Sequence, residues 1–296
     1  MEAFIKIAVT GGKGFLGRNL VERFKSEGHE VVVLDLPELD VCNRNPVRLS
    51  LGGVDAVHHL AYVNGTERFY EVPEQVLRVA VKGIVNVLEA AIENRVPEFF
   101  LCSSSEVYQT PPCYPTPEDV PLVVPDVMNP RYSYGGGKII SELMAINYGR
   151  KYFDRVCIYR PHNVYGPGMG PYHVIPQLTR RFMAGDLTIK GSGEETRCFN
   201  YIDDFVDGVS LIQEHGGHLE IYNIGTPRET RTIDLAWMIA QDLGLNNHSF
   251  IHAVAADGGT RRRYPDISKL MALGYEPKVN LELGLINTIA WLKSQS

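Results

Sequence analysis

Short apolar runs alternate with longer amphipathic patterns over the first half of the chain. Apolar runs of this length are typical of buried strands, whereas apolar positions three or four residues apart predict helices. The predicted strands are Phe4–Val9, Glu30–Leu34, Ala56–Leu60, Glu98–Cys102 and Arg155–Tyr159. The predicted helices between them are Gly14–Glu27, Pro73–Glu93 and Tyr132–Tyr152. This alternation predicts an α/β fold with a Rossmann-type, doubly wound parallel sheet.

After Gly166 the pattern changes to shorter helical segments separated by glycine and proline. The predicted helices there are Tyr172–Ala184, Asp203–His215, Ile233–Leu243 and Leu281–Lys293. We therefore expect a Rossmann domain over residues 1–165 plus about 201–217, and a smaller mixed α/β lobe over 166–200 and 218–296. The proline-rich segment 108–130 cannot form a regular element, so it is predicted to be a long ordered loop.

Composition and charge narrow the class of protein. The chain is 44% hydrophobic and 22% charged, which is typical of a globular protein. Its 29 Lys and Arg against 35 Asp and Glu give a net charge of −6, so a nucleic-acid-binding face is not expected. Five scattered cysteines without zinc-type spacing indicate reduced thiols and no metal site. With no apolar stretch of about 18 residues and no leader pattern, we expect a cytoplasmic protein away from membranes.

A glycine-rich segment follows the first predicted strand and opens a helix. Gly12, Gly14 and Gly17 have G-x-G-x-x-G spacing, which allows a tight turn and close approach of the backbone to a pyrophosphate. The helix N-terminus adds free N–H groups and a positive dipole end. The second strand ends in Asp35, where a carboxylate can bind a ribose 2′-hydroxyl and would repel a 2′-phosphate. The sequence therefore predicts NAD rather than NADP.

A second motif places a phenol and an ammonium on one helix face. Tyr134 and Lys138 are four residues apart, so their side chains project from the same side. A nearby ammonium and the positive nicotinamide ring together favour phenolate, so we expect them to lower the pKa of Tyr134 and make it a base for a hydroxyl. The strand Glu98–Cys102 delivers Ser104, Ser105 and Glu106 to the carboxyl edge of the sheet, where open α/β sheets bind ligands.

Together these motifs resemble the extended short-chain dehydrogenase/reductase family, in its group of nucleotide-sugar epimerases and dehydratases. The motifs that carry the resemblance, in chain order, are Thr10–Gly17, Asp35, His58–Ala61, Ser103–Tyr108, Tyr134 with Lys138, Arg160–Pro167 and Tyr201–Asp204. They cover nearly the whole chain.

The resemblance implies roles for individual residues. The NAD-binding residues would be Gly11, Gly14, Phe15, Leu16, Gly17, Asp35, Asp40, Val41, Leu60, Ala61, Tyr134, Lys138 and Pro161. Ser104 would bind the reacting C4 hydroxyl of the sugar, Tyr134 would remove its proton, and Lys138 would hold the nicotinamide ribose. The substrate diphosphate would be bound by Asn163, Arg197, Arg262 and Arg263. The substrate would be a UDP-, GDP- or dTDP-linked sugar, and the protein would be a homodimer that pairs the helices 73–93 and 132–152.

The chain also departs from the family pattern. Ala80 and Lys82 stand where an asparagine is common, and Gln109 replaces the usual glycine after Val107-Tyr108. Glu106 matches the C5 base of dehydratases, but Ser105 stands where several of them have an aspartate. The two residues resemble instead the Ser-Glu pair of GDP-mannose dehydratases and UDP-glucuronate decarboxylases. Three outcomes of the 4-keto intermediate stay open: epimerisation, which we favour, 4,6-dehydration, and oxidation with or without decarboxylation. A non-catalytic NAD-sensing protein is a remote fourth.

Overall fold

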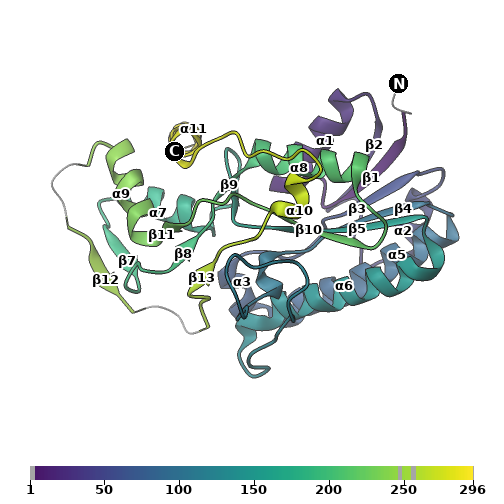
Figure 1. Cartoon of the computed structure of the whole chain (residues 1–296), viewed down its shortest axis with the longest axis horizontal. Coiled ribbons are helices and arrows are strands. Elements are labelled where there is room, and N and C mark those ends of the chain that lie inside the picture. Colours follow the sequence, from purple (N-terminus) through teal and green to yellow (C-terminus); the bar gives the residue numbers. More distant parts are fainter. Residues whose placement is uncertain (1–3, 246–248, 255–257, 296) are drawn as a thin grey trace.

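A six-stranded parallel sheet forms the centre of the larger part of the molecule (Figure 1). The structure is a computed structural model that describes residues 4–245, 249–254 and 258–295. The strand order is β10-β5-β4-β3-β1-β2, and every neighbouring pair is parallel. The strands are β1 (Lys6–Thr10), β2 (Glu30–Leu34), β3 (Ala56–His59), β4 (Glu98–Cys102), β5 (Arg155–Pro161) and β10 (Glu220–Ile224). The predicted fold class is confirmed.

The sheet contains one strand that the sequence pattern did not predict. β10 (Glu220–Ile224) pairs with β5, with Ile221 opposite Ile158 and Ile224 opposite Pro161. Residues 218–296 were expected in the second lobe, but this short segment completes the edge of the large sheet. Its burial pattern is continuous rather than alternating, because both faces of the sheet are covered there.

Helices cover both faces of the sheet (Figure 1). α1 (Phe15–Ser26) and α8 (Ile202–His215) pack together on one face. On the other face lie α2 (Arg44–Ser50), α5 (Ile84–Glu93) and α6 (Ser133–Tyr152). The helix predicted over Pro73–Glu93 consists of α4 (Pro73–Arg78), a π-helical turn η1 (Val79–Gly83) and α5. The sequence pattern missed α2 and also α3 (Thr66–Glu71), since both are too short for a clear period.

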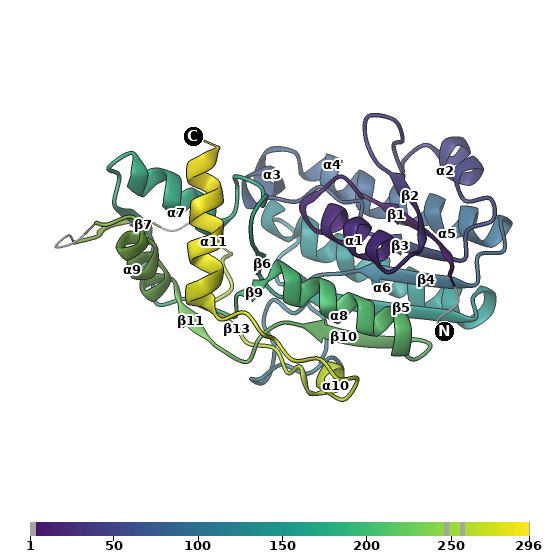
Figure 2. The same cartoon turned by 90° about the horizontal axis from the view of Figure 1, so that it is seen from above.

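The second lobe is built from helices and very short strands. Figure 2 shows α11 (Leu281–Ser294) in the middle of the molecule. On one side of it lie α7 (Val174–Met183) and α9 (Thr232–Asp242), and on the other side lies the half of the molecule that holds the sheet. The remaining helix, α10 (Ser268–Met271), contacts β10. The small strands are β6 (Val164–Tyr165), β7 (Thr188–Lys190), β8 (Thr196–Arg197), β9 (Asn200–Tyr201), β11 (Thr230–Arg231), β12 (Ile251–Ala253) and β13 (Arg262–Arg263).

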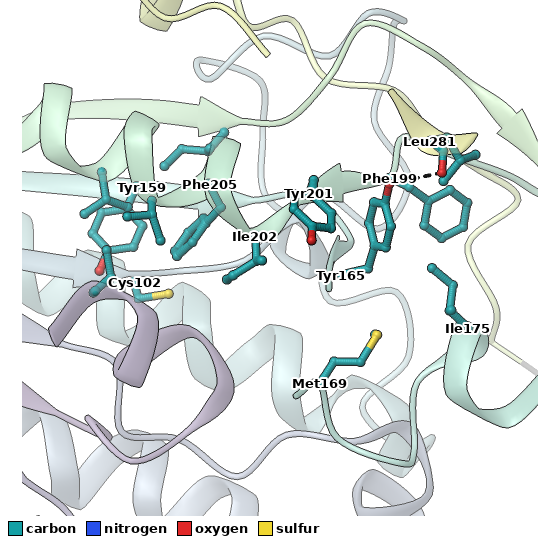
Figure 3. Packing of buried hydrophobic residues seen from close by; sticks show 14 of the residues in the cluster. Cys102, Tyr159, Tyr165, Met169, Ile175, Phe199, Tyr201, Ile202, Phe205 and Leu281 are labelled. Carbon is teal, nitrogen blue, oxygen red and sulfur yellow. Dashed lines mark hydrogen bonds between the residues drawn. The ribbon is translucent and has the colours of Figure 1, made fainter. Parts of the chain in front are cut away.

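One hydrophobic cluster runs from the sheet into the second lobe (Figure 3). Tyr159 and Phe205 belong to its sheet end, whereas Tyr165 and Phe199 belong to its lobe end. The Tyr165 hydroxyl donates a hydrogen bond to the Leu281 carbonyl at 3.4 Å, which joins the lobe to the first turn of α11. Burial of each large side chain contributes about 1.5–3 kcal/mol. This shared core fixes the second lobe against the carboxyl edge of the sheet.

The proline-rich segment connects two distant parts of the chain. It contains no helix or strand between the 3-10 turns η2 (Ser105–Val107) and η3 (Pro130–Tyr132), as predicted. Thr116 exchanges backbone hydrogen bonds with Tyr264 and Asp266, at 2.8 and 2.9 Å. These bonds bring the segment that carries Arg263 back to the end of β4. In the described part of the chain, no helix is both long and apolar enough to cross a membrane.

Candidate active site

The glycine loop lies at the carboxyl ends of β1 and β3. Gly11 has φ +69°, and a Cβ on it would lie 2.8 Å from the Ala61 nitrogen. A Cβ on Gly17 would lie 2.1 Å from the Gly11 carbonyl oxygen. Only glycine therefore lets the loop, the start of α1 and the Ala61 backbone pack this closely. The cradle at a helix N-terminus fits a pyrophosphate.

The other residues predicted to bind NAD surround this loop. The Asp35 carboxylate accepts hydrogen bonds from the backbone N–H groups of Lys13 and Leu36, both at 2.8 Å, so it is fixed beside the glycine loop. Val41 packs against the π-turn at Gly83, and its carbonyl accepts a hydrogen bond from Asn86. The remaining predicted residues lie at the same edge: Phe15 and Leu16 in the first turn of α1, Asp40 before Val41, Leu60 after β3 and Pro161 at the end of β5. This arrangement fits a dinucleotide.

Tyr134 and Lys138 lie in the first turns of α6, and both are buried. The Lys138 Nζ donates a hydrogen bond to the Cys102 carbonyl at the end of β4, at 2.7 Å. Ser104 follows on the same strand end, close enough to the Tyr134 phenol to lower its pKa. The structure therefore brings together the three residues that the sequence motifs predicted to act on the sugar hydroxyl.

The predicted lowering of the Tyr134 pKa depends on the nicotinamide ring, and the surroundings of Tyr134 in the protein alone act in the opposite direction. Burial raises the pKa of Tyr134 well above its ordinary value, and the effect of Ser104 is smaller. The Lys138 Nζ lies 5.8 Å from the Tyr134 ring centre and donates its hydrogen bond to the Cys102 carbonyl. Burial also lowers the pKa of Lys138, to about 8. In the protein by itself, Tyr134 is therefore a neutral phenol at pH 7.

Glu106 is held by two arginines. Arg131 binds one carboxylate oxygen at 2.9 Å, and Arg263 binds the other at 2.7 Å. Burial alone would raise the pKa of Glu106, but Arg263 and Arg131 lower it to about 2. Arg131 also lies over the ring of Phe69, which stacks on Tyr134 with ring centres 4.7 Å apart. The ring of Phe69 therefore lies between Arg131, which binds Glu106, and the ring of Tyr134.

Gln109, which replaces the usual glycine, completes the cluster. Its backbone has φ +44°, a left-handed conformation that favours glycine. Its amide nitrogen donates hydrogen bonds to the Glu106 carbonyl at 2.7 Å and to the Glu106 carboxylate at 3.0 Å. Its amide oxygen accepts a hydrogen bond from the Thr260 hydroxyl at 3.3 Å. Gln109 thus adopts the left-handed backbone conformation that a glycine would have here, and its side chain adds hydrogen bonds to Glu106.

The residues predicted to bind the diphosphate divide into two groups. Arg263 turns toward Glu106, whereas Arg262 forms a two-pronged ion pair with Glu229 at 2.7 and 2.8 Å. Neighbouring residues of β13 point to opposite sides, so only Arg263 belongs to the cluster with Glu106. Arg197 lies near Arg263, donates to the Thr260 carbonyl at 2.7 Å, and has its pKa lowered to about 9 by burial and by Arg263.

Asn163 and Ser105 are the two predicted site residues that remain to be placed. Asn163 has φ +42°, and its side chain donates to the Cys198 carbonyl at 3.3 Å. Ser105 is buried in the turn η2. A cavity of about 320 Å³ lies beside the Glu106 cluster, and its walls include Gln109, Tyr132 and Thr260. Its size is in the range of small-ligand sites.

Sequence reasoning missed three residues of the site: Arg131, Tyr62 and Phe69. Arg131 stands three residues before Tyr134, so its position on the approach to the helix was the available signal. Tyr62 and Phe69 sit in an irregular segment and in α3, which no pattern predicted. Of the two departures near the lysine, Ala80 is buried against α6, whereas Lys82 is exposed.

Comparison with known proteins shows which family the chain belongs to. The model of the "NAD dependent epimerase/dehydratase family" matches residues 7–225. The chain is 31% identical over 310 residues to UDP-glucuronic acid decarboxylase 1 of Xenopus tropicalis, covering 98% of this chain and 72% of that protein. It is 30% identical over 319 residues to UDP-glucose 4-epimerase of Mycolicibacterium smegmatis, covering 99% and 100%.

A solved structure gives the same result. DesIV, a dTDP-glucose 4,6-dehydratase from Streptomyces venezuelae solved with NAD and TYD bound, matches with a TM-score of 0.90 and 28% identity, covering 98% of this chain and 97% of that one. The resemblance predicted from the motifs is confirmed, as are the NAD dependence and the expectation of an enzyme. The chain belongs to the NAD-dependent epimerase/dehydratase family, and the relatives named above act on nucleotide-sugars.

Proposed function

We propose that this enzyme is a nucleotide-sugar 4-epimerase with a UDP- or dTDP-linked substrate. The observation that supports it is the state of Glu106. A carboxylate bound by Arg131 and Arg263, with a pKa of about 2, is a poor base for a C5 proton. Ser105, at the position of a dehydratase acid, has no acidic proton to expel water. With neither group active, a 4-keto sugar would keep its C5 and C6 substituents.

The proposed reaction needs only the groups around Tyr134. Ser104 would bind the C4 hydroxyl, and Tyr134 would take its proton after the nicotinamide charge and Lys138 had stabilised the phenolate. When bound, the cofactor would supply the hydride chemistry, which is removal of hydride from C4 and its return to the opposite face of the sugar. Tyr134 would then return the proton. The ring of Phe69, stacked on Tyr134, would keep water away from the phenol.

The diphosphate would be bound by arginines at the edge of the second lobe. Arg197 and Arg263 carry two positive charges near Thr260, and Glu106 balances one of them. Phosphate oxygens match guanidinium N–H groups well. Arg262, paired with Glu229, would contribute only if that ion pair opened, and Asn163 would bind the substrate beside β9.

A second candidate, decarboxylation of a uronic acid, is favoured by a separate observation. The Arg131 Nη1 and the Arg263 Nε are buried and have no hydrogen-bond partner among the described residues. Buried guanidinium donors of this kind are able to bind an anionic ligand. A sugar C6 carboxylate could fill that role, and a 4-keto uronic acid loses carbon dioxide without needing Glu106 as a base.

Product analysis distinguishes the two candidates. The purified enzyme would be incubated with NAD and, separately, UDP-glucose, dTDP-glucose and UDP-glucuronate, and the products followed by NMR and mass spectrometry. Epimerisation predicts a galacto product of unchanged mass. Loss of carbon dioxide from UDP-glucuronate would establish the second candidate, and loss of water from either hexose would overturn both.

We also propose that the enzyme is a homodimer. Leu77 and Val81, one turn apart, are 39% and 40% exposed, and Ile140 and Leu143 on α6 are 38% and 60% exposed. Each pair lies on one side of its helix, which is typical of an apolar face that a second copy covers. Light scattering should give twice the chain mass, and Leu143→Glu should give the single-chain mass.

A further inference from the structure

Tyr62 lies against the lysine of the active site. The Lys138 Nζ is 3.8 Å from the centre of the Tyr62 ring, closer than to the ring of Tyr134 at 5.8 Å. The edge of one tyrosine ring meets the face of the other at 78°, with centres 5.1 Å apart. Tyr62 directly follows Ala61 in the segment after β3, whereas the Cys102 carbonyl that binds Lys138 belongs to β4. Two separate segments therefore meet at the ammonium.

Small residues on two helices make room for the Tyr62 phenol. A Cβ on Gly137 would lie 2.3 Å from the Tyr62 hydroxyl and 2.7 Å from the Cβ of Ala80. Neither distance is possible between real atoms, so glycine at 137 is required while Tyr62 and Ala80 are present. Ala80 lies in the π-turn η1, and such turns are frequent at functional sites. The pocket for this ring is therefore built by the fold.

The Tyr62 hydroxyl itself does little. It is buried and has no hydrogen-bond partner of good geometry among the described residues, although Ser141 is close enough to oppose slightly the burial that raises its pKa. The ring rather than the hydroxyl is thus the part that acts on Lys138. A tyrosine ring face carries partial negative charge and attracts an ammonium within about 6 Å.

Lys138 has few other groups that favour its charge. In the part of the chain that the structure describes, its Nζ forms no ion pair, and its hydrogen bond goes to the neutral Cys102 carbonyl. The titratable groups that face it from the surrounding elements are Cys102, Glu142, His59, Tyr134 and Tyr62. Glu142 is engaged by Arg160 at 2.6 and 2.9 Å, and burial lowers the pKa of His59, so it is neutral.

We propose that Tyr62 is a positioning residue that keeps Lys138 charged and beside Tyr134 through contact with its ring face. The inference concerns the charge of Lys138, and it holds whichever product the enzyme forms. Tyr62→Phe keeps the ring and removes the hydroxyl, whereas Tyr62→Leu removes the ring. The two variants therefore separate the ring from the hydroxyl.

The direct test is titration of Lys138 by NMR in the full-length protein labelled with ¹³C-lysine, with and without added NAD. The Lys138 signal is identified by its absence in Lys138→Met. Tyr62→Leu should lower the pKa of Lys138 by about 0.5–1.5 units, the size of a cation–π contact. Tyr62→Phe should leave it within about 0.3 units of the wild type, since the ring is retained.

Activity gives a second readout. In Tyr62→Leu the alkaline limb of the kcat profile should move down by the same amount, because Lys138 loses its proton earlier. Tyr152→Leu is the matched control, since it removes a ring 4.9 Å from the Lys151 Nζ on the exposed end of the same helix. It should leave the Lys138 titration unchanged.

Two results would overturn the proposal. One is a Lys138 pKa in Tyr62→Leu equal to that of the wild type in a protein that unfolds at the normal temperature. The other is an equal shift in Tyr62→Phe and Tyr62→Leu, which would assign the effect to the hydroxyl. If Tyr62→Leu does not fold, Tyr62→Met is titrated in its place under the same two criteria.

Discussion

Lys138 and Glu106 are buried charged residues of one active site, yet their surroundings have opposite effects. Lys138 has one carbonyl and the faces of two rings around its ammonium, and burial lowers its pKa to about 8. Glu106 has two arginines and a glutamine around its carboxylate, and the arginines lower its pKa to about 2. The pKa of Lys138 lies near neutral pH, whereas that of Glu106 is far from it.

The difference follows from the number of opposite charges that the fold supplies. A buried charge without a counter-charge is costly, so its neutral form becomes accessible. A buried charge with two counter-charges is held in its ionised form. A group that tunes a proton transfer works best with a pKa near the operating pH, so Lys138 suits catalysis and Glu106 suits binding and structure.

Removing the phenol that Lys138 serves should have the largest effect. Tyr134→Phe should slow turnover by about 10³-fold, because Tyr134 is the proposed base for the C4 hydroxyl. The measurement is product formation by NMR, with NAD binding and thermal unfolding as controls for folding. A Tyr134→Phe enzyme within about tenfold of the wild type would show that another group is the base.

Breaking the ion pairs of Glu106 should affect stability rather than catalysis. Glu106→Gln should lower the free energy of unfolding by about 3 kcal/mol, because two buried arginines lose their counter-charge. Under the epimerase proposal turnover should stay within about tenfold of the wild type. Glu229→Gln, at a partly exposed ion pair with Arg262, is the control and should cost about 1 kcal/mol or less. If a folded Glu106→Gln protein turned over about a hundredfold more slowly, a C5 base would be favoured.

The ion pairs of Glu106 also predict how the stability of the protein depends on pH. The pKa of Glu106 is lower in the folded protein than its ordinary value of 4.5, so its stabilisation is complete above pH 4.5 and disappears as pH falls toward about 2. Urea unfolding of wild type and Glu106→Gln should therefore differ most near neutral pH and converge in acid. A difference that is constant over this range would contradict the assigned pKa.

The pKa of Lys138 should set the pH above which activity falls. The proposed mechanism needs the Lys138 ammonium to stabilise the phenolate, so kcat should fall about tenfold per pH unit above about pH 8. The check is a pH profile at saturating substrate and NAD, with NAD binding measured at each pH. Activity that stays level to about pH 10 would show that the ammonium keeps its proton or is not required.

Gln109 should give the smallest effect. Gln109→Gly relieves a left-handed backbone at φ +44° but loses hydrogen bonds to Glu106, so its unfolding free energy should change by about 1 kcal/mol or less. Gln109→Ala loses the same bonds and keeps the unfavourable backbone, so it should be less stable than Gln109→Gly. Equal stability of the two variants would show that the backbone at 109 is not strained.

Local patterns in the sequence were sufficient to predict the half of the candidate site that would bind the cofactor. The glycine loop, the strand that ends before Asp35, and the Tyr134–Lys138 spacing each lie within one strand–helix unit. Their geometry depends on neighbours along the chain, so a motif can predict it. The β-strands of the large sheet were predicted within a residue or two, except for β10, whose sequence Glu-Ile-Tyr-Asn-Ile mixes polar and apolar residues and so gives no clear apolar run.

The sequence by itself therefore determined the fold class, the family and the NAD dependence, and it predicts which residues bind NAD and which pair acts on a hydroxyl. Only the tertiary structure decided how Glu106 is held and which ring faces Lys138. Arg131 and Arg263 reach Glu106 from two other segments, Gln109 reaches it from the same turn, and Tyr62 reaches Lys138 from a third segment. The pKa of a buried group depends on every charge and dipole around it in space, and segments far apart in the chain supply most of them.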